Sequence, residues 1–146
     1  MLIIPAKAKT EPAGLSRRLG AIMYDSLLVI ALWVLTLLIF AMGTSADPAS
    51  LQATPAIYVQ LVCGLETFLF FYFFWMYRAR TLGMMAWHTH LATASGKALR
   101  PKHILLRFIG AILNIATMGL GYLWILVDKQ NRSFSDLLSG TNILRD

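Results

Sequence analysis

The sequence predicts an all-α membrane protein with three hydrophobic segments and a small strand-like element on the cytoplasmic side. Hydrophobic residues make up 58% of the chain and charged residues only 14%, whereas soluble domains are about 25% charged. The mean hydropathy is +0.63, and three stretches approach the roughly 20 apolar residues that a helix needs to cross a bilayer. At 146 residues we expect one domain, whose helices pack against one another in lipid.

The first hydrophobic segment covers about residues 19–42 and follows a polar arm, residues 1–18, that we expect in the cytoplasm. Its sequence is uncharged from Ser26 to Met42, but Asp25 lies near its start. An isolated carboxylate at membrane depth costs roughly 2.5–3.5 kcal/mol, so it needs a partner, a proton or a bound cation. Asp25 is therefore a candidate site for ion or proton coupling. The alternative is a structural ion pair that locks two helices together.

The second segment covers residues 56–77 and contains the deepest charge of the chain. Glu66 lies near the middle of this segment, with only Gln60 and Thr67 as polar neighbours in the sequence. Intramembrane carboxylates of this kind are typical of ion and proton pathways. Glu66 is therefore the second candidate for ion or proton coupling, and the alternative is permanent neutralisation by an arginine.

The third segment, residues 108–127, is either a straight span or a broken, re-entrant one. A straight helix of this length would reach about 30 Å and place the C-terminus outside. Gly119 and Gly121 favour a break, and non-helical backbone is allowed at membrane depth where protein or a cavity covers it. Because the positive-inside rule prefers Lys129 and Arg132 in the cytoplasm, we favour the broken form.

Two short stretches, residues 87–93 and 141–144, have strand-like composition, and residues 95–97 read as a turn after the first of them. If the two strands pair, the loop after the second hydrophobic segment and the C-terminal tail lie on one side of the membrane. This pairing again favours a broken third segment.

The Lys and Arg residues predict the orientation. They concentrate in the N-terminal arm and in residues 78–103, whereas residues 43–55 have none. The positive-inside rule therefore places the N-terminus and residues 78–103 in the cytoplasm and residues 43–55 outside. The net charge of +6 follows from this topology and favours contact with anionic lipid headgroups. No nucleic-acid motif accompanies it, so we expect no nucleic-acid partner.

The order of several short motifs is similar to that of a known family. Arg18 precedes Asp25 by seven residues, Thr81–Met84 follows the second segment, and Arg107 opens the last segment. Near the end of the chain, Asp136 precedes a run that closes in the second strand-like stretch. This order resembles the RDD family of small bacterial membrane proteins, named for one arginine and two aspartates, which we map to Arg18, Asp25 and Asp136.

The resemblance covers about residues 15–144 and implies a multi-pass protein of the bacterial inner membrane, and the Lys and Arg placement puts its N-terminus in the cytoplasm. It also implies suspected transport of small solutes, and some members look like cation/proton exchangers. For this chain we expect Na⁺, Li⁺, K⁺ or H⁺ as the transported ions. One departure is Ser135, where many relatives carry His. A role that needs an imidazole at that position is therefore in doubt.

The charged residues of the membrane segments lead to two function hypotheses. Arg18 and Arg107 enter at similar depth, and with Asp25 and Glu66 they would form a nearly neutral cluster. Arg18 and Asp25 share a helix face but lie about 10.5 Å apart along the axis. In the first hypothesis, Asp25 or Glu66 couples cation and proton transport. In the second, the arginines hold both acids in a static clamp, and the protein is a non-transporting accessory or assembly subunit.

Asp136 is expected to cap a short surface helix, unless it reaches Arg18 or Arg107 and joins their charge network. The sequence carries no nucleophile–base pattern, phosphate loop or metal signature, so we expect no enzyme, no cofactor and no metal site. Three segments are few to enclose a pathway, so a transporter of this size is expected to form a homo-oligomer.

Overall fold

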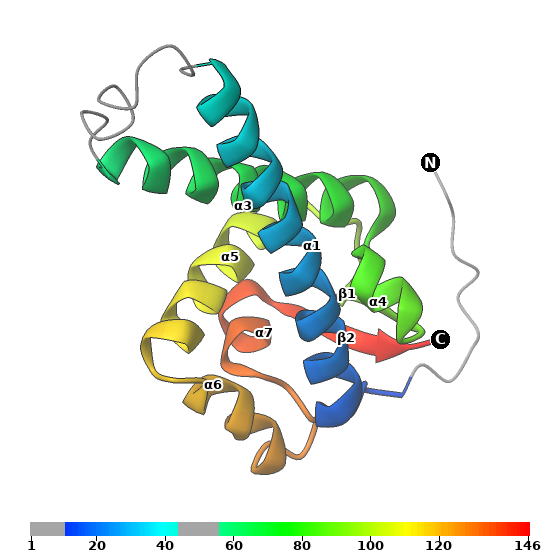
Figure 1. Ribbon diagram of the computed structural model, residues 1–146. Coiled ribbons are helices and arrows are strands. Elements are labelled where there is room, and N and C mark those ends of the chain that lie inside the picture. The colour runs from blue at the N-terminus through cyan, green and yellow to red at the C-terminus, as the bar shows by residue number, and fades with distance from the viewer. Residues whose placement is uncertain (1–10, 44–55) are drawn as a thin grey trace.

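The computed structural model describes residues 11–43 and 56–146. The loop expected to face outward, apart from Gly43, and most of the polar arm lie outside these described residues. The elements are, in order, α1 (Leu15–Gly43), α3 (Ala56–Arg78), α4 (Leu82–Ala86), β1 (Thr89–Thr93), α5 (Pro101–Ala116), α6 (Leu120–Leu123), the 3-10 helix η1 (Trp124–Leu126), α7 (Phe134–Ser139) and β2 (Thr141–Arg145) (Figure 1). The fold is thus mainly helical with one two-stranded sheet, as the sequence predicts.

Among the described residues, two helices are long and apolar enough to cross a membrane. They are Leu15–Met42, with a hydropathy of 2.4, and Ala56–Arg78, with a hydropathy of 1.7. The C-terminal half of α1 and the first half of α3 project beyond the rest of the described chain (Figure 1). Their large apolar side chains are exposed there, as suits helices that face lipid.

Helix α1 begins at Leu15, four residues earlier than the sequence suggested. The residues before it are held by the sheet, because Ala13 N donates to Ile143 O at 2.9 Å. The first turn then closes through a bond from Arg18 N to Gly14 O. Arg18 therefore belongs to the helix itself and not to the polar arm.

The third hydrophobic segment is broken, as the sequence favoured. Helix α5 and the following α6–η1 segment are bent by 108°. The chain turns at Met118 and Gly119, which have φ values of 54° and 86°. A left-handed backbone costs glycine little, so Gly119 is a natural place for this turn. Helix α5 begins at Pro101 and not near residue 108, because proline suits the first helical turn.

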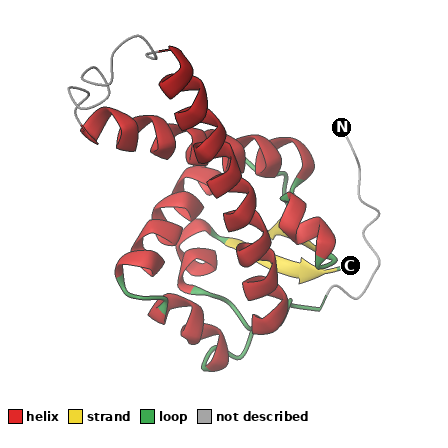
Figure 2. Ribbon diagram, viewed as in Figure 1, coloured by secondary structure: helices red, strands yellow, loops and turns green. Residues whose placement is uncertain are grey.

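The sheet joins segments from three parts of the chain. Strand β1 pairs with β2 in antiparallel register, with Leu91 opposite Ile143. Pro12 adds an isolated bridge to Leu144. The start of α1, the loop after α3 and the C-terminal tail therefore lie at one end of the molecule (Figure 2). The strand pairing predicted from the sequence is confirmed.

A small apolar core lies where α1, α3, α4, α5 and the sheet meet. Ile104 and Leu91 are almost completely buried at its centre. Its buried members are Ala13, Ala21, Trp75, Met84, Leu91, Ile104 and Ile143. This core fixes the end of the molecule at which most of the buried charges gather.

We predict that the loop after β1 and the segment after η1 are accessible from the same side of a membrane. Lys97→Cys and Lys129→Cys, each combined with Cys63→Ser, should react with a membrane-impermeant maleimide from the same face of oriented vesicles. Both lysines are exposed, and the pairing of β1 with β2 brings the chain before and after the third segment to one end of the molecule. Labelling of the two sites from opposite faces would contradict a re-entrant third segment.

Candidate functional site

The centre of the buried polar groups is Asp136, which binds two arginines at once. Arg18 of α1 donates from Nη1 to Asp136 Oδ2, and Arg107 of α5 donates from Nη1 to Asp136 Oδ1 at 2.6 Å. All three residues are at most 5% exposed. We call these three residues the charge clamp. The structure thus brings together the three residues that the sequence grouped as a charge network.

The local sequence around α7 sets the position of Asp136. Ser133 is the N-cap of α7, and its side chain accepts from Asp136 N at 3.3 Å. In return, Ser133 N donates to Asp136 Oδ2 at 3.0 Å. This capping box satisfies backbone donors that a helix start would leave unpaired. Asp136 therefore both caps a short helix and reaches the arginines, so the two expected roles occur together.

Arg18 also connects three separate backbone segments. Its Nε donates to Ala13 O at 2.9 Å, and its Nη2 donates to Asn131 O at 2.8 Å and to Ile143 O at 3.4 Å. Because each N–H of a buried guanidinium needs an acceptor, these carbonyls are part of what makes its burial tolerable. Arg18 thereby holds the start of α1 against the tail and β2.

Arg107 has two further contacts. Its Nη1 donates to Thr141 Oγ1 at 2.9 Å at the start of β2, and its Cζ lies 5.3 Å from the centre of the Trp75 ring. A guanidinium over an indole face gains a cation–π attraction. Through Trp75, α3 also contacts the charge clamp. The contacts of the three clamp residues thus connect α1, α3, α5, α7 and β2.

Asp136 is held in its ionised form. Burial alone would raise its pKa, but the positive charges of Arg107 and Arg18 and their hydrogen bonds hold the pKa of this carboxyl below its usual range. The charge clamp therefore contains two positive charges and one negative charge. The carbonyls around Arg18 and the Trp75 ring are well placed to offset the remaining positive charge.

Asp25 is not part of the charge clamp. It is 4% exposed and accepts from Thr81 Oγ1 at 2.5 Å and from Gly83 N at 2.8 Å. These donors belong to the start of α4, which packs against α1. The alternative hypothesis, in which the two arginines neutralise Asp25 and Glu66, does not describe Asp25, because Arg18 binds Asp136 instead.

Gly83 makes the contact between Asp25 and α4 feasible. A Cβ atom at this position would lie 2.3 Å from Ala21 O and 2.9 Å from the Asp25 carboxyl group. Only a residue without a side chain lets the α4 backbone approach α1 so closely. The carboxylate of Asp25 can then bind a backbone N–H of the neighbouring helix.

Glu66 lies on α3 opposite α1, in the part of the molecule farther from the sheet. Thr36 Oγ1 donates to Glu66 Oε1 at 2.5 Å, whereas Oε2 is buried without a hydrogen-bond partner among the described residues. Beside it, Trp33 Nε1 donates to Cys63 O at 3.0 Å. The same alternative does not describe Glu66, because both arginines bind Asp136.

Sequence reasoning missed the hydroxyl groups that complete these sites. Thr36, Thr81 and Thr141 each bind one of the charged residues. Only Ser133 had a recognisable signal, since a serine three residues before an acidic residue is typical of a capping box. The three threonines come from different elements, and their contacts depend on how the helices pack.

Two histidines near the sheet have hydrogen-bond partners. His90 Nδ1 lies 2.6 Å from Asp146 Oδ1, and His103 Nδ1 lies 2.9 Å from Ser139 O. The structure does not gather them into a group of ligands within its described ranges, residues 11–43 and 56–146.

The fold and these contacts define a class of small helical proteins with apolar, membrane-type helices and buried charges. A family model described as the RDD family matches residues 12–140. This match covers most of the chain, which therefore belongs to the RDD family. No curated protein and no solved structure matches the chain.

We predict that Gly83→Ala destabilises the protein by about 1–3 kcal/mol, the usual cost of inserting a methyl group into a packed contact. The matched control is Gly64→Ala, because a Cβ at residue 64 meets nothing within 4 Å. Unfolding in mixed micelles would measure both effects. Equal stability of the two variants would show that α4 does not pack on α1 as described.

We predict that Asp136→Asn destabilises the protein by about 3–5 kcal/mol, because it leaves two buried arginines without their anion. Asp128→Asn is the control. Asp128 pairs with Arg132 at 3.0 Å in a more exposed i,i+4 bridge, and such surface pairs contribute little. Unfolding transitions of both variants in the same detergent at pH 7 would test the difference.

The same pair of proteins gives a pH prediction. Because the folded pKa of Asp136 is lowered, its contribution to stability is fully present above the unfolded pKa of about 3.9. It is lost as the pH falls through the folded pKa. The stability gap between wild type and Asp136→Asn should therefore stay constant from pH 7 to about 4 and shrink below that. A gap that closes near neutral pH would contradict an ionised Asp136.

Proposed function

We propose that this RDD-family membrane protein exchanges a monovalent cation, Na⁺, Li⁺ or K⁺, for protons, with Asp25 and Glu66 as the coupling carboxylates. One observation supports this most. Within residues 11–43 and 56–146, neither carboxylate forms an ion pair, whereas both buried arginines bind Asp136. The arginines thus leave the two candidate carboxylates without a fixed counter-charge.

A carboxylate in an apolar helix must be compensated in some way. One that is paired with arginine stays ionised, as Asp136 does. A carboxylate whose partners are only hydroxyl and amide donors is stabilised most by binding a proton or a metal cation. Competition between these two ligands for one carboxylate is the simplest basis for exchange. Glu66 suits this role best, because its Oε2 is buried and unpartnered in the described structure.

Asp25 offers a link between proton binding and movement. Hydrogen bonds to an ionised acceptor are stronger than those to a neutral one. Protonation of Asp25 would weaken its bonds from Thr81 and Gly83 and so loosen α4 from α1. We therefore expect the position of α4 relative to α1 to depend on whether Asp25 is protonated.

The proposal includes a homo-oligomer in the bacterial inner membrane with the N-terminus in the cytoplasm. Two long apolar helices and one bent pair are few to surround a pathway, so several copies would do so together. The positive-inside rule supports the orientation. The proposal assigns the protein no catalytic reaction.

A second candidate function is a non-transporting accessory or assembly subunit. The charge clamp favours it, since Arg18, Asp136 and Arg107 are mutually satisfied and suit a static structural role. In this case Asp25 would serve only to attach α4. The two candidates differ in whether neutral replacements of Asp25 and Glu66 affect ion movement.

We predict that purified protein in liposomes dissipates a pH gradient when Na⁺, Li⁺ or K⁺ is added. Glu66→Gln and Asp25→Asn should each reduce this flux at least about tenfold, because a neutral amide cannot exchange a proton. Asp128→Asn should retain it, since Asp128 pairs with Arg132 outside the long apolar helices. A pH-sensitive dye trapped in the vesicles would report the flux.

The outcomes separate the two candidates. Flux in wild type and Asp128→Asn but not in the other two variants supports exchange at these carboxylates. Equal flux in all four proteins would contradict the coupling role. Folded protein without flux under any cation gradient would favour the accessory subunit, and co-purification with one stoichiometric membrane partner would then support it.

A further inference from the structure

Residues 80–90 leave the end of α3 and return to nearly the same point at β1. The two ends are joined directly, because Leu91 N donates to Ala79 O at 2.7 Å. The short helix α4 lies within this stretch and packs against α1 (Figure 1). We call residues 80–90 the α4 loop. Compact loops with closely spaced ends are frequently functional, and contiguous units of a fold can open without unfolding the rest.

The C-terminal tail holds both ends of the α4 loop. Asp146 N donates to His88 O at 3.0 Å, and the Asp146 carboxylate lies 3.1 Å from Arg80 Nη1 and 2.6 Å from His90 Nδ1. Because His88 O stays bound to the tail, rotation about the N–Cα bond of His88 moves α4 while β1 stays in place. The φ of His88 is 51°, which is unfavourable for a residue with a Cβ atom. The closed position is therefore strained at this hinge.

The α4 loop covers the side of α1 that carries Ala21 and Asp25. These residues are four apart in the sequence, so they share one helix face, and each is 4% exposed. A Cβ atom at Gly83 would lie 2.3 Å from Ala21 O, so the loop and the helix are in direct contact. Among residues 11–43 and 56–146, both donors to Asp25 belong to this loop, namely Thr81 Oγ1 and Gly83 N.

The far end of the α4 loop is attached to α1 through contacts at the surface. The Trp87 ring lies against Gly20, where a Cβ atom would come within 2.2 Å of it, and Arg17 Nη1 donates to Trp87 O at 3.1 Å. Trp87 is 41% exposed, so water can replace the bond from Arg17. Hydrogen bonds to an ionised acceptor are stronger than neutral ones. The buried bonds to Asp25 are therefore the main attachment of the loop.

We propose that the α4 loop is a lid over Asp25 that opens as a unit. In the closed position Thr81 and Gly83 bind the carboxylate and exclude water. Rotation at Arg80 and His88 opens the loop and admits water, protons and small cations to Asp25. The side chains of Arg80 and Asp146 are 36% and 35% exposed, so the base of the loop borders water. Because this inference concerns access to Asp25 alone, it does not depend on the proposed exchange.

The test measures how fast a cysteine beneath the α4 loop reacts with a reagent that reaches it only from water. The full chain carrying Ala21→Cys and Cys63→Ser would be placed in nanodiscs and treated with a quaternary-ammonium methanethiosulfonate, and the label would be followed by mass spectrometry. Ile104→Cys in the same background reports general unfolding, because Ile104 is 0% exposed and lies outside the loop. We expect slow labelling at residue 21 and slower labelling at residue 104. Labelling at residue 21 as fast as at the exposed Lys97→Cys would overturn the proposal.

Thr81→Val isolates the attachment, because valine keeps the shape of threonine without its hydroxyl. It should accelerate labelling at residue 21 at least about tenfold, as the loss of one hydrogen bond to a charged group allows, and leave residue 104 unchanged. Thr81→Ser keeps the hydroxyl and should label like the protein with Thr81. Unchanged labelling in Thr81→Val, or equal acceleration at both cysteines, would overturn the proposal.

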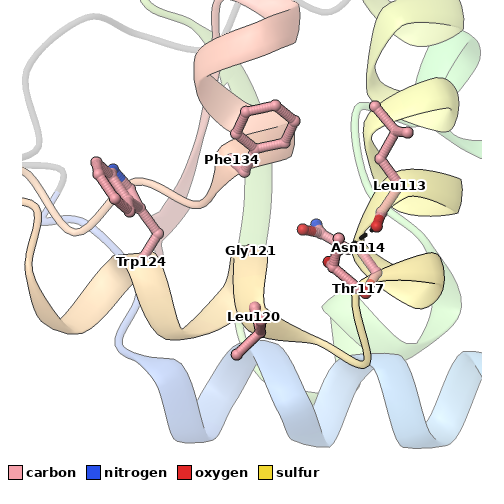
Figure 3. A pocket seen from close by; sticks show the side chains of 7 residues that line it. All are labelled: Leu113, Asn114, Thr117, Leu120, Gly121, Trp124 and Phe134. Carbon is pink, nitrogen blue, oxygen red and sulfur yellow. Dashed lines mark hydrogen bonds between the residues drawn. The ribbon is translucent and has the colours of Figure 1, made fainter.

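The matched control is Thr117→Val at the end of α5. The Thr117 hydroxyl donates to Leu113 O at 2.9 Å, beside the break of the third segment and outside the α4 loop (Figure 3). This variant should not change labelling at residue 21. If Ala21→Cys does not fold, backbone hydrogen exchange of Thr81→Val and Thr117→Val without added cysteines decides the proposal. Faster exchange confined to residues 82–88 in Thr81→Val supports it, whereas unchanged exchange, or an increase that extends to α5, overturns it.

Discussion

The attachment of Asp136 to two arginines is the interaction on which the rest of the structure depends. Arg18 comes from α1 and Arg107 from α5, which are far apart in the sequence, and both side chains are buried. Neither could remain there without an anion, because an unpaired buried charge is strongly unfavourable. The position of α7, and with it the start of β2, follows from this requirement. The two-stranded sheet then completes the same end of the molecule.

The structure also separates two kinds of buried acid. Asp136 has two cationic partners, whereas Asp25 and Glu66 are bound by threonine hydroxyls and one backbone N–H. The first arrangement is typical of a structural clamp, and the second leaves a charge that a small ion can balance. This difference in partners, more than depth in the membrane, is the basis for assigning different roles to residues of the same chemical type.

Much of the fold was predictable because hydropathy and glycine positions act locally. The three segments, the break near Gly119 and the pairing of residues 87–93 with 141–144 all follow from such patterns. The partners of the charges were less predictable. Sequence spacing placed Arg18 on the same helix face as Asp25, whereas the structure directs the arginine towards Asp136, 118 residues away. Contacts of this range depend on packing that no local pattern contains.

The long separation of Arg18 and Asp136 also bears on how the protein is made. Ribosomes deliver α1 first, yet the anion that Arg18 needs arrives 118 residues later. Until α7 has emerged, both arginines remain uncompensated at the edge of the nascent helices, and the sheet lacks its second strand. A chain that stops before α7 can insert its apolar helices but cannot close. The ion pairs to Asp136 and the second strand of the sheet can therefore form only after the C-terminal tail has been made.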